Sequence, residues 1–293
     1  MFELLGVAPQ ALYAQLVVGL SNGAFYALLS LGLAVIFGML NVINFAHGAQ
    51  YMMGAFVAWM LLNYAGIPFW GALVLVPLIV GAFGFVLEKL LLSRLHGIDH
   101  LYGLLLTFGL ALVVEGVFRH FYGVSGLPYP KPIEGFVNLG FMNLPIYRGF
   151  AIVLSLAVCL ATWFAIERTK LGSYLRAATE RPDLVQAFGI NVPRMISLTY
   201  AFGVALAALA GVLAAPIYSV NPKMGSEIII VVFAVVVIGG MGSIMGSIVT
   251  GFGLGLIEGL TKVFYPQGSN VVVFVIMVIV LLIRPQGLFG SPK

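Results

Sequence analysis

The chain has 293 residues, of which 61% are hydrophobic, 8% are charged and 36 are glycine, with a net charge of +4. Soluble domains carry roughly 25% charged residues, so this composition excludes a water-exposed globular fold. The positive charge is concentrated in loops and therefore indicates membrane topology, not nucleic-acid binding. We therefore expect an all-α polytopic membrane protein.

Nine segments are candidates for crossing the hydrocarbon, because a spanning helix needs about 20 apolar residues. They are 13–40, 45–63, 69–87, 101–121, 149–167, 195–217, 227–240, 244–262 and 271–283. The first is long enough to contain a bend, and the seventh is too short to cross alone if it is straight. We expect eight or nine transmembrane helices, including broken or re-entrant ones.

A polar row interrupts the apolar pattern between the first two segments. Asn41, Asn44, His47 and Gln50 recur every three residues, and Gly48 permits a bend. Such a row occupies one side of a helix or a tight polar break between two helices. Because non-helical backbone at membrane depth must face protein or water, the row is a candidate lining of a solute path.

Two acids in apolar segments are each followed four residues later by a cation. Glu115 precedes Arg119, and Glu258 precedes Lys262, which is the favourable order for a contact on one helix face. We expect neutralised helix ends, with a proton relay as the alternative.

The segment 122–148 contains four prolines and several glycines, which prevent a regular helix. We expect a short ordered cap at the membrane surface; a docking site for an external protein is the alternative.

The interval 168–194 holds five of the chain's 14 Lys and Arg residues. Cations accumulate in cytoplasmic loops, so we place this loop and the C-terminus inside and the N-terminus outside. Pro182 suits a first helical position and Gly189 a helix stop, which predicts a short helix over 182–188. Its apolar residues Leu184, Val185 and Phe188 share one face, so the helix either docks on a partner or lies on the membrane interface.

The last third carries two glycine patterns. Gly251, Gly255 and Gly259 recur at spacing four, as do Gly242 and Gly246, which is typical of closely packed helices in lipid. The run Gly239, Gly240, Met241, Gly242 and Ser243 is a second interruption at membrane depth. Two breaks in the two halves of a chain point to a transport path; two ordinary tight turns are the alternative.

No catalytic or metal-binding constellation is present in the sequence. It contains no phosphate-binding P-loop, no H-E-x-x-H pattern, and a single cysteine, Cys159, within an apolar segment. We expect no catalytic residue, no metal and no bound cofactor.

Four motifs resemble one known family. GLSNGAFYALLSLGLAVIFGMLNVINFAHG (19–48), YLRAATERPDLVQAFGINVPR (174–194), VIGGMGSIMGSIVTG (237–251) and RPQGLFG (284–290) are similar to the permease subunits of branched-chain amino acid ABC importers, the LivH type. The resemblance covers nearly the whole chain and implies one permease domain, 1–293, in a bacterial inner membrane.

This resemblance implies partners and residue roles. It implies a second similar permease, two ATPase subunits that bind ATP and Mg, and a periplasmic substrate-binding protein, so the chain itself is not expected to be an enzyme. The polar row and the glycine run described above give the predicted translocation path, which comprises Asn41, Asn44, His47, Gln50, Gly239, Gly240, Gly242 and Ser243. The implied ATPase-coupling residues are Arg176, Ala177, Ala178, Asp183, Leu184, Val185, Phe188 and Gly189.

One departure bears on the solute. Family members often carry an acidic residue shortly after N-F-A-H-G, whereas here Ala49 and Gln50 follow. Urea, short amides or another small polar solute are therefore alternatives to branched-chain amino acids, and a stand-alone secondary transporter is a further one.

Overall fold

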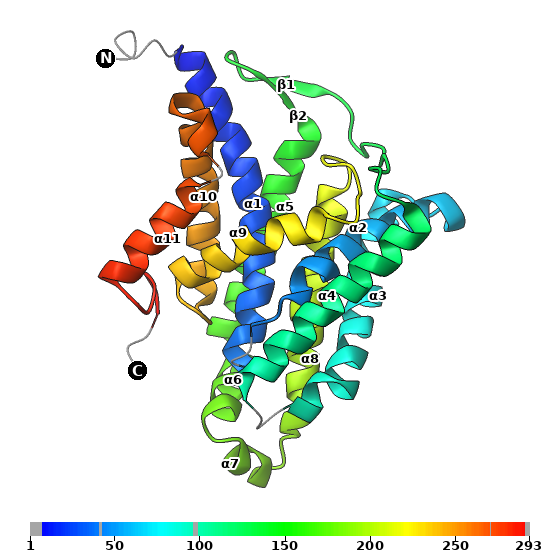
Figure 1. Ribbon diagram of the computed structural model, residues 1–293, viewed down its shortest axis with the longest axis vertical. Helices are drawn as coiled ribbons and strands as arrows, with labels where there is room; N and C mark the ends of the chain where they lie inside the picture. Colours follow the sequence, from blue (N-terminus) through cyan, green and yellow to red (C-terminus); the bar gives the residue numbers. More distant parts are fainter. Residues whose placement is uncertain (1–7, 41–42, 96–98, 270, 291–293) are drawn as a thin grey trace.

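The computed structural model describes residues 8–40, 43–95, 99–269 and 271–290 (Figure 1). The described residues form eleven α-helices, two short 3-10 helices and one small hairpin. The first helices are α1 (Pro9–Leu40), α2 (Ala46–Ala65), α3 (Phe69–Leu90), η2 (Leu92–Leu95) and α4 (His100–Tyr122). The later ones are α5 (Ile146–Glu167), α6 (Lys170–Glu180), α7 (Pro182–Ala187), α8 (Val192–Ala214), α9 (Met224–Gly239), α10 (Ile244–Phe264), η3 (Pro266–Gly268) and α11 (Val272–Ile283).

Each predicted span is a helix in the structure. Six helices, α1, α3, α4, α5, α8 and α10, are long and apolar enough to cross a membrane, and α9 and α11 are shorter apolar helices. The ninth predicted span is α2, with 20 residues. The predicted all-α polytopic membrane fold is therefore confirmed. The first span contains no interruption, since α1 is one helix of 32 residues.

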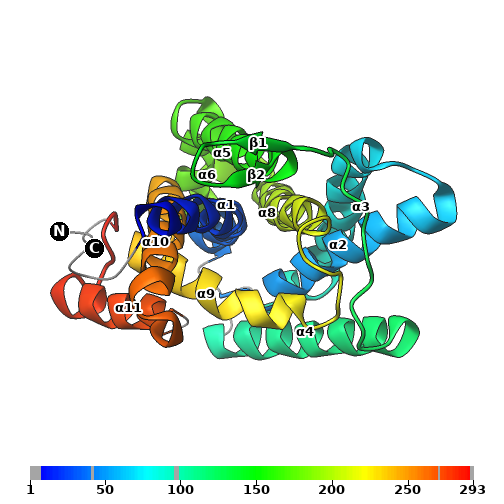
Figure 2. The same cartoon turned by 90° about the horizontal axis from the view of Figure 1, so that it is seen from above.

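Helices α1 and α10 form the most extensive pair and lie side by side near the centre (Figure 2). Their backbones approach so closely that only glycine fits. A Cβ on Gly255 would lie 2.3 Å from Cα of Gly23, and one on Gly251 would lie 2.5 Å from Cα of Ala27. The glycine ladder thus acts as predicted, in helix packing.

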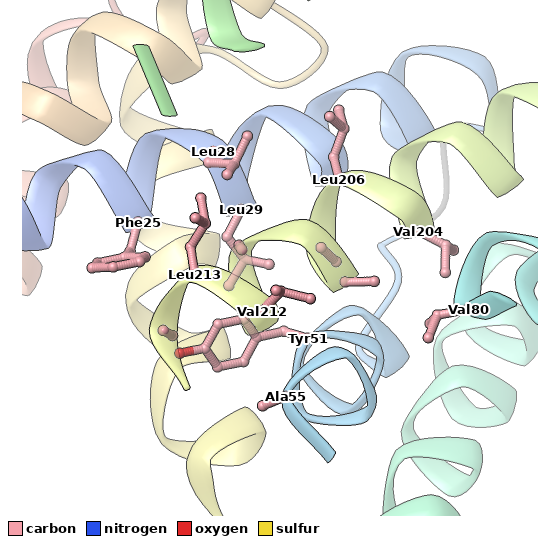
Figure 3. Packing of buried hydrophobic residues seen from close by; sticks show 14 of the residues in the cluster. Phe25, Leu28, Leu29, Tyr51, Ala55, Val80, Val204, Leu206, Val212 and Leu213 are labelled. Carbon is pink, nitrogen blue, oxygen red and sulfur yellow. The ribbon is translucent and has the colours of Figure 1, made fainter. Parts of the chain in front are cut away.

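A second close contact joins α8 to α2 and α3. A Cβ on Gly54 of α2 would lie 2.3 Å from the carbonyl oxygen of Ala208 in α8. The main hydrophobic core lies between these helices and α1. Figure 3 shows side chains of all four meeting there, among them Phe25, Tyr51, Val80 and Leu213.

The segment between α4 and α5 forms the predicted ordered cap, with no helix in it. Strand β1 (Phe136–Asn138) pairs antiparallel with β2 (Asn143–Pro145). Leu127 also pairs with Val220, through N–H···O distances of 2.8 and 3.0 Å, which ties this segment to the loop between α8 and α9. The hairpin lies at the opposite end of the molecule from α6 and α7 (Figure 1).

The two predicted acid–cation pairs behave differently. Lys262 Nζ lies 2.5 Å from Glu258 Oε1, and Glu258 also accepts a hydrogen bond of 2.7 Å from Tyr26. The first prediction is confirmed. In the described part of the chain no ion pair joins Glu115 to Arg119, so that prediction is wrong; Glu115 is half-buried and Arg119 is exposed.

Candidate functional site

The break between α1 and α2 is closed by side chains from distant helices. Asn44 Nδ2 donates to the Tyr200 hydroxyl at 3.1 Å and to Gln50 Oε1 at 3.4 Å. Gln50 Nε2 donates to the same hydroxyl at 2.9 Å. All three residues are at most 2% exposed. The predicted polar break is therefore real, and a tyrosine of α8 bridges its two amides.

Backbone groups at the start of α2 are also satisfied by side chains. The N–H of Ala46 donates to Asn44 Oδ1 at 3.1 Å, and that of Phe45 donates to the Thr107 hydroxyl of α4 at 3.2 Å. Buried N–H groups need such partners. Asn41, the first residue of the predicted row, lies outside the described residues.

His47 has a packing role. Its ring is fully buried, with Nε2 2.9 Å from the carbonyl oxygen of Leu29. A Cβ on Gly32 would lie 3.0 Å from the His47 ring, so the absence of a side chain at this position of α1 makes room for the imidazole. His47 thus fastens α2 to α1 beside the polar break.

A cavity of about 910 Å³ adjoins the break; we call it the inner cavity. Its polar wall gathers residues from four regions of the chain: Asn44, Glu88, Thr107, Ser197 and Tyr200. Ser197 donates a hydrogen bond to the Glu88 carboxylate, which is only 1% exposed. The sequence analysis did not identify Glu88 or its partner, although a carboxylate at the end of an apolar span was a usable signal.

The inner cavity extends from the break to α6 and α7. Ala178 and Thr179 of α6 line it, as do Pro182 and Gln186 of the α7 segment. Ala178, one of the eight predicted coupling residues, and the predicted path residue Asn44 therefore border one space. Movement of α6 and α7 would change the volume next to the Asn44–Gln50–Tyr200 cluster.

The second break, at Gly239–Ser243, is closed by backbone. Gly240 and Gly242 have φ angles of +102° and +83°, which favour glycine. The C-terminal tail covers the turn: Leu288 N–H donates to the Ile238 carbonyl at 2.8 Å, and Phe289 N–H donates to the Gly239 carbonyl at 3.0 Å.

The two predicted path segments do not share the inner cavity. None of Gly239, Gly240, Gly242 or Ser243 is among the described residues that line it. Gly242 instead borders a smaller cavity of about 240 Å³ with Gly38 and Arg176. A common path formed with a second subunit remains a prediction for these glycines, as it does for Asn44, His47 and Gln50.

The interval 168–194 contains two helices where one was predicted. Pro182 begins α7 and Gly189, with φ +84°, follows it, as expected. Helix α6 was missed; its Arg176 pairs with Glu167 at 3.3 Å. Ala177 and Asp183 are exposed.

The predicted apolar face of α7 needs a correction. Phe188 is 85% exposed and Leu184 is 56% exposed, but Val185 is only 7% exposed. Val185 packs with Ala178 and Val192 in a small separate core. Val185 therefore anchors α7 to the rest of the chain, and only Leu184 and Phe188 are available to a partner.

Within the described residues, no group of His, Cys, Asp and Glu side chains is arranged to hold a metal ion. The cavity wall offers amides, hydroxyls, two carboxylates (Glu88 and Asp99) and two cations (Lys89 and Arg194), groups that suit contact with a polar solute.

A family model described as "Branched-chain amino acid transport system / permease component" matches residues 15–281. The chain belongs to this permease family. The permease is 32% identical to BraD, the high-affinity branched-chain amino acid transport system permease protein of Pseudomonas aeruginosa, over 95% of this chain and 96% of BraD.

Two Escherichia coli proteins extend the comparison. The permease is 29% identical to LivH over 98% of this chain and 99% of LivH. It is 30% identical to LivM over 92% of this chain and 68% of LivM. Both are named as permease proteins of a high-affinity branched-chain amino acid transport system. No solved structure matches the chain.

Proposed function

We propose that this permease is the transmembrane subunit of an ATP-binding cassette importer that moves branched-chain or related small amino acids across the bacterial inner membrane. The observation that carries the proposal is the family match over residues 15–281, together with near full-length similarity to BraD and LivH. A multi-pass fold with a polar-walled inner cavity supports it.

The importer would contain a second, homologous permease beside this one. The similarity of this chain to both LivH and LivM, two permease proteins with the same system name, supports pairing of two related subunits. A periplasmic binding protein would deliver the solute at the hairpin end. We expect tight solute affinity to reside in that protein, because a tight site needs several convergent charge and hydrogen-bond partners.

Two ATPase subunits, with their ATP and Mg, would supply the energy, and α7 would be a contact for one of them. Phe188 and Leu184 are large apolar side chains exposed to solvent on a charged segment. An aromatic residue of this kind is a typical interface anchor. Because α6 and α7 also border the inner cavity, ATPase movement would reach the polar break through them.

The proposal is tested by reconstituting the complex in proteoliposomes and measuring leucine uptake with and without ATP. Uptake should require the ATPases and the binding protein. Uptake by this chain alone would instead establish a secondary transporter. ATP-dependent uptake of urea or short amides, with none of leucine, would keep the importer and replace its solute.

The ATPase contact is tested by Phe188→Asp. Truncating an interface anchor costs about 2 kcal/mol or more of binding, so the variant should fold normally and lose co-purification with the ATPase. Phe136→Asp is the matched control, since Phe136 is 66% exposed on the opposite hairpin end. If Phe188→Asp co-purifies and keeps solute-stimulated ATP turnover, the coupling role of α7 is wrong.

A further inference from the structure

A second cavity, of about 540 Å³, lies away from the inner one; we call it the outer cavity. Residues of α1, α2, α9 and the loop between α8 and α9 line it. That loop pairs with Leu127 through Val220, so the cavity belongs to the hairpin end of the molecule. This is the end at which a delivered solute would enter.

Two polar groups in the outer cavity lack a protein partner. Tyr51 of α2 is 3% exposed, yet no described residue forms a hydrogen bond with its hydroxyl. Figure 3 shows the ring of Tyr51 beside Leu213, with its oxygen at the outer tip. The hydroxyl itself is not sealed from solvent and opens on the cavity, where a ligand or a water molecule can bond to it.

The second such group is Glu227. Its carboxylate is exposed and, among the described residues, forms no ion pair or hydrogen bond. Glu258, by contrast, is neutralised by Lys262 and Tyr26. Glu227 lies in the first turn of α9 and lines this cavity, so its carboxylate is open to a cationic group of a ligand.

The rest of the lining mixes apolar and polar side chains. Met224, Ile228 and Val231 lie on the same face of α9 as Glu227, and Phe25 of α1 also lines the cavity, as do the polar residues Asn22, Ser219 and Asn221. A carboxylate, a hydroxyl donor and an apolar surface in one cavity match the three parts of an aliphatic amino acid. The volume lies within the range of about 300–1,000 Å³ that is usual for small-molecule sites.

We propose that the outer cavity binds the incoming zwitterionic amino acid. Glu227 binds the α-ammonium group, the Tyr51 hydroxyl donates to the α-carboxylate, and the apolar wall accommodates the aliphatic side chain. This inference rests on the proposed importer function and gives that function a solute-contacting site on the entry side. With few polar contacts, the site holds its solute weakly and can release it inward.

The test uses the complete complex with a single cysteine at the rim of the cavity, Ser219→Cys, in a Cys159→Ala background. Alkylation by a water-soluble maleimide is measured with increasing leucine, with isoamylamine, which lacks the carboxylate, or with isocaproate, which lacks the ammonium group. Leucine should slow the reaction, because it occupies the cavity beside position 219.

The variants should separate the two ends of the ligand. Glu227→Gln should raise the half-protecting concentrations of leucine and isoamylamine about tenfold, as expected for loss of a charge-assisted contact, and leave isocaproate unchanged. Tyr51→Phe should weaken the protection given by leucine and by isocaproate, and should leave the protection given by isoamylamine unchanged. Glu227 also sits in the first turn of α9, where an acid stabilises the helix, but lost helix stability would not produce this ligand-selective pattern.

Glu115→Gln is the matched control, because it neutralises an acid of an apolar helix outside the cavity, and it should change no protection. Unaltered leucine protection in Glu227→Gln, in a complex that transports leucine, would overturn the site alone. If the Glu227→Gln complex does not assemble, the Tyr51→Phe variant decides: equal loss of protection by all three ligands would overturn the proposed site. Absence of leucine transport by the wild-type complex would overturn the proposed function and this site together.

Discussion

The chain leaves helical geometry at two places in apolar surroundings, and the two breaks are stabilised by different means. At the first break the freed N–H groups of Phe45 and Ala46 donate to the side chains of Thr107 and Asn44. The Asn44 amide is in turn held by Tyr200 and Gln50. At Gly239 the freed carbonyl bonds to the backbone of the C-terminal tail, through Phe289 N–H at 3.0 Å.

The first break is part of a cavity surface, whereas the second is a seam, that is, a close contact between two backbone segments. Side-chain closure leaves the Asn44 amide and the hydroxyls of Thr107 and Tyr200 on the wall of a cavity of about 910 Å³, where a solute could meet them. Backbone closure brings two chain segments so close that a Cβ on Gly240 would lie 2.5 Å from the Gly290 nitrogen. The first break therefore places side chains on a cavity wall, whereas the second is closed by contacts between backbone segments.

The largest expected effect comes from breaking the seam with Gly240→Val. Backbone strain at positive φ costs about 1–3 kcal/mol and overpacking costs about 1–3 kcal/mol, so the free energy of unfolding should fall by about 2–6 kcal/mol. Thermal unfolding in detergent measures this. Gly253→Ala is the control, because a Cβ there meets no atom within 4 Å; equal stability of the two variants would show that the seam is not tight.

Removing the tail should have a smaller effect. Truncation after Ile283 deletes the N–H donors of Leu288 and Phe289 and costs about 1–3 kcal/mol for two net hydrogen bonds. Amide hydrogen exchange should then rise in the turn at 240–243 and stay unchanged at Asn44. Unchanged exchange at the turn would mean that the tail does not close it.

A change in stability of about 1–3 kcal/mol, for the two hydrogen bonds that the Tyr200 hydroxyl accepts, is expected for Tyr200→Phe. Tyr147→Phe is the comparison, because the Tyr147 hydroxyl donates one hydrogen bond, to the Leu213 carbonyl at 2.8 Å, and Tyr147 is equally buried. This variant should lose less stability, about 0.5–1.5 kcal/mol, and only Tyr200→Phe should reduce the transport rate per folded complex. Equal transport rates in the two variants would contradict a role of the first break in transport.

Much of the fold could be predicted from apolar length and local chemistry. The nine spans, the non-helical 122–148 segment and the start of α7 at Pro182 follow from hydropathy, proline and glycine, which act within a few residues. The glycines at 251 and 255 signalled a close helix contact. Their partner, α1, lies more than 200 residues earlier in the chain and no local pattern identifies it.

The site was harder to predict because its residues meet only in the folded chain. Asn44 was found from its polar spacing, whereas Tyr200 and Ser197 look like ordinary residues of an apolar helix. In the sequence Glu88 is followed by Lys89 and resembles a solvated helix end. In the fold it is buried and accepts a hydrogen bond from Ser197. Val185 was placed on a free face because helical spacing cannot tell which apolar residue packs inward.

The central claim, that the first break opens on the inner cavity and the second is closed by backbone contacts, is tested most directly by cysteine accessibility. Asn44→Cys and Ser247→Cys would be compared in a Cys159→Ala background, since Asn44 lines the inner cavity and Ser247, bonded to Ser243 at 3.0 Å, is fully buried beside the seam. A small water-soluble thiol reagent should modify position 44, at a rate that changes when ATP is trapped on the ATPases, and should leave position 247 unmodified. Inert cysteines at both positions in every nucleotide state, or faster reaction at 247, would contradict the account.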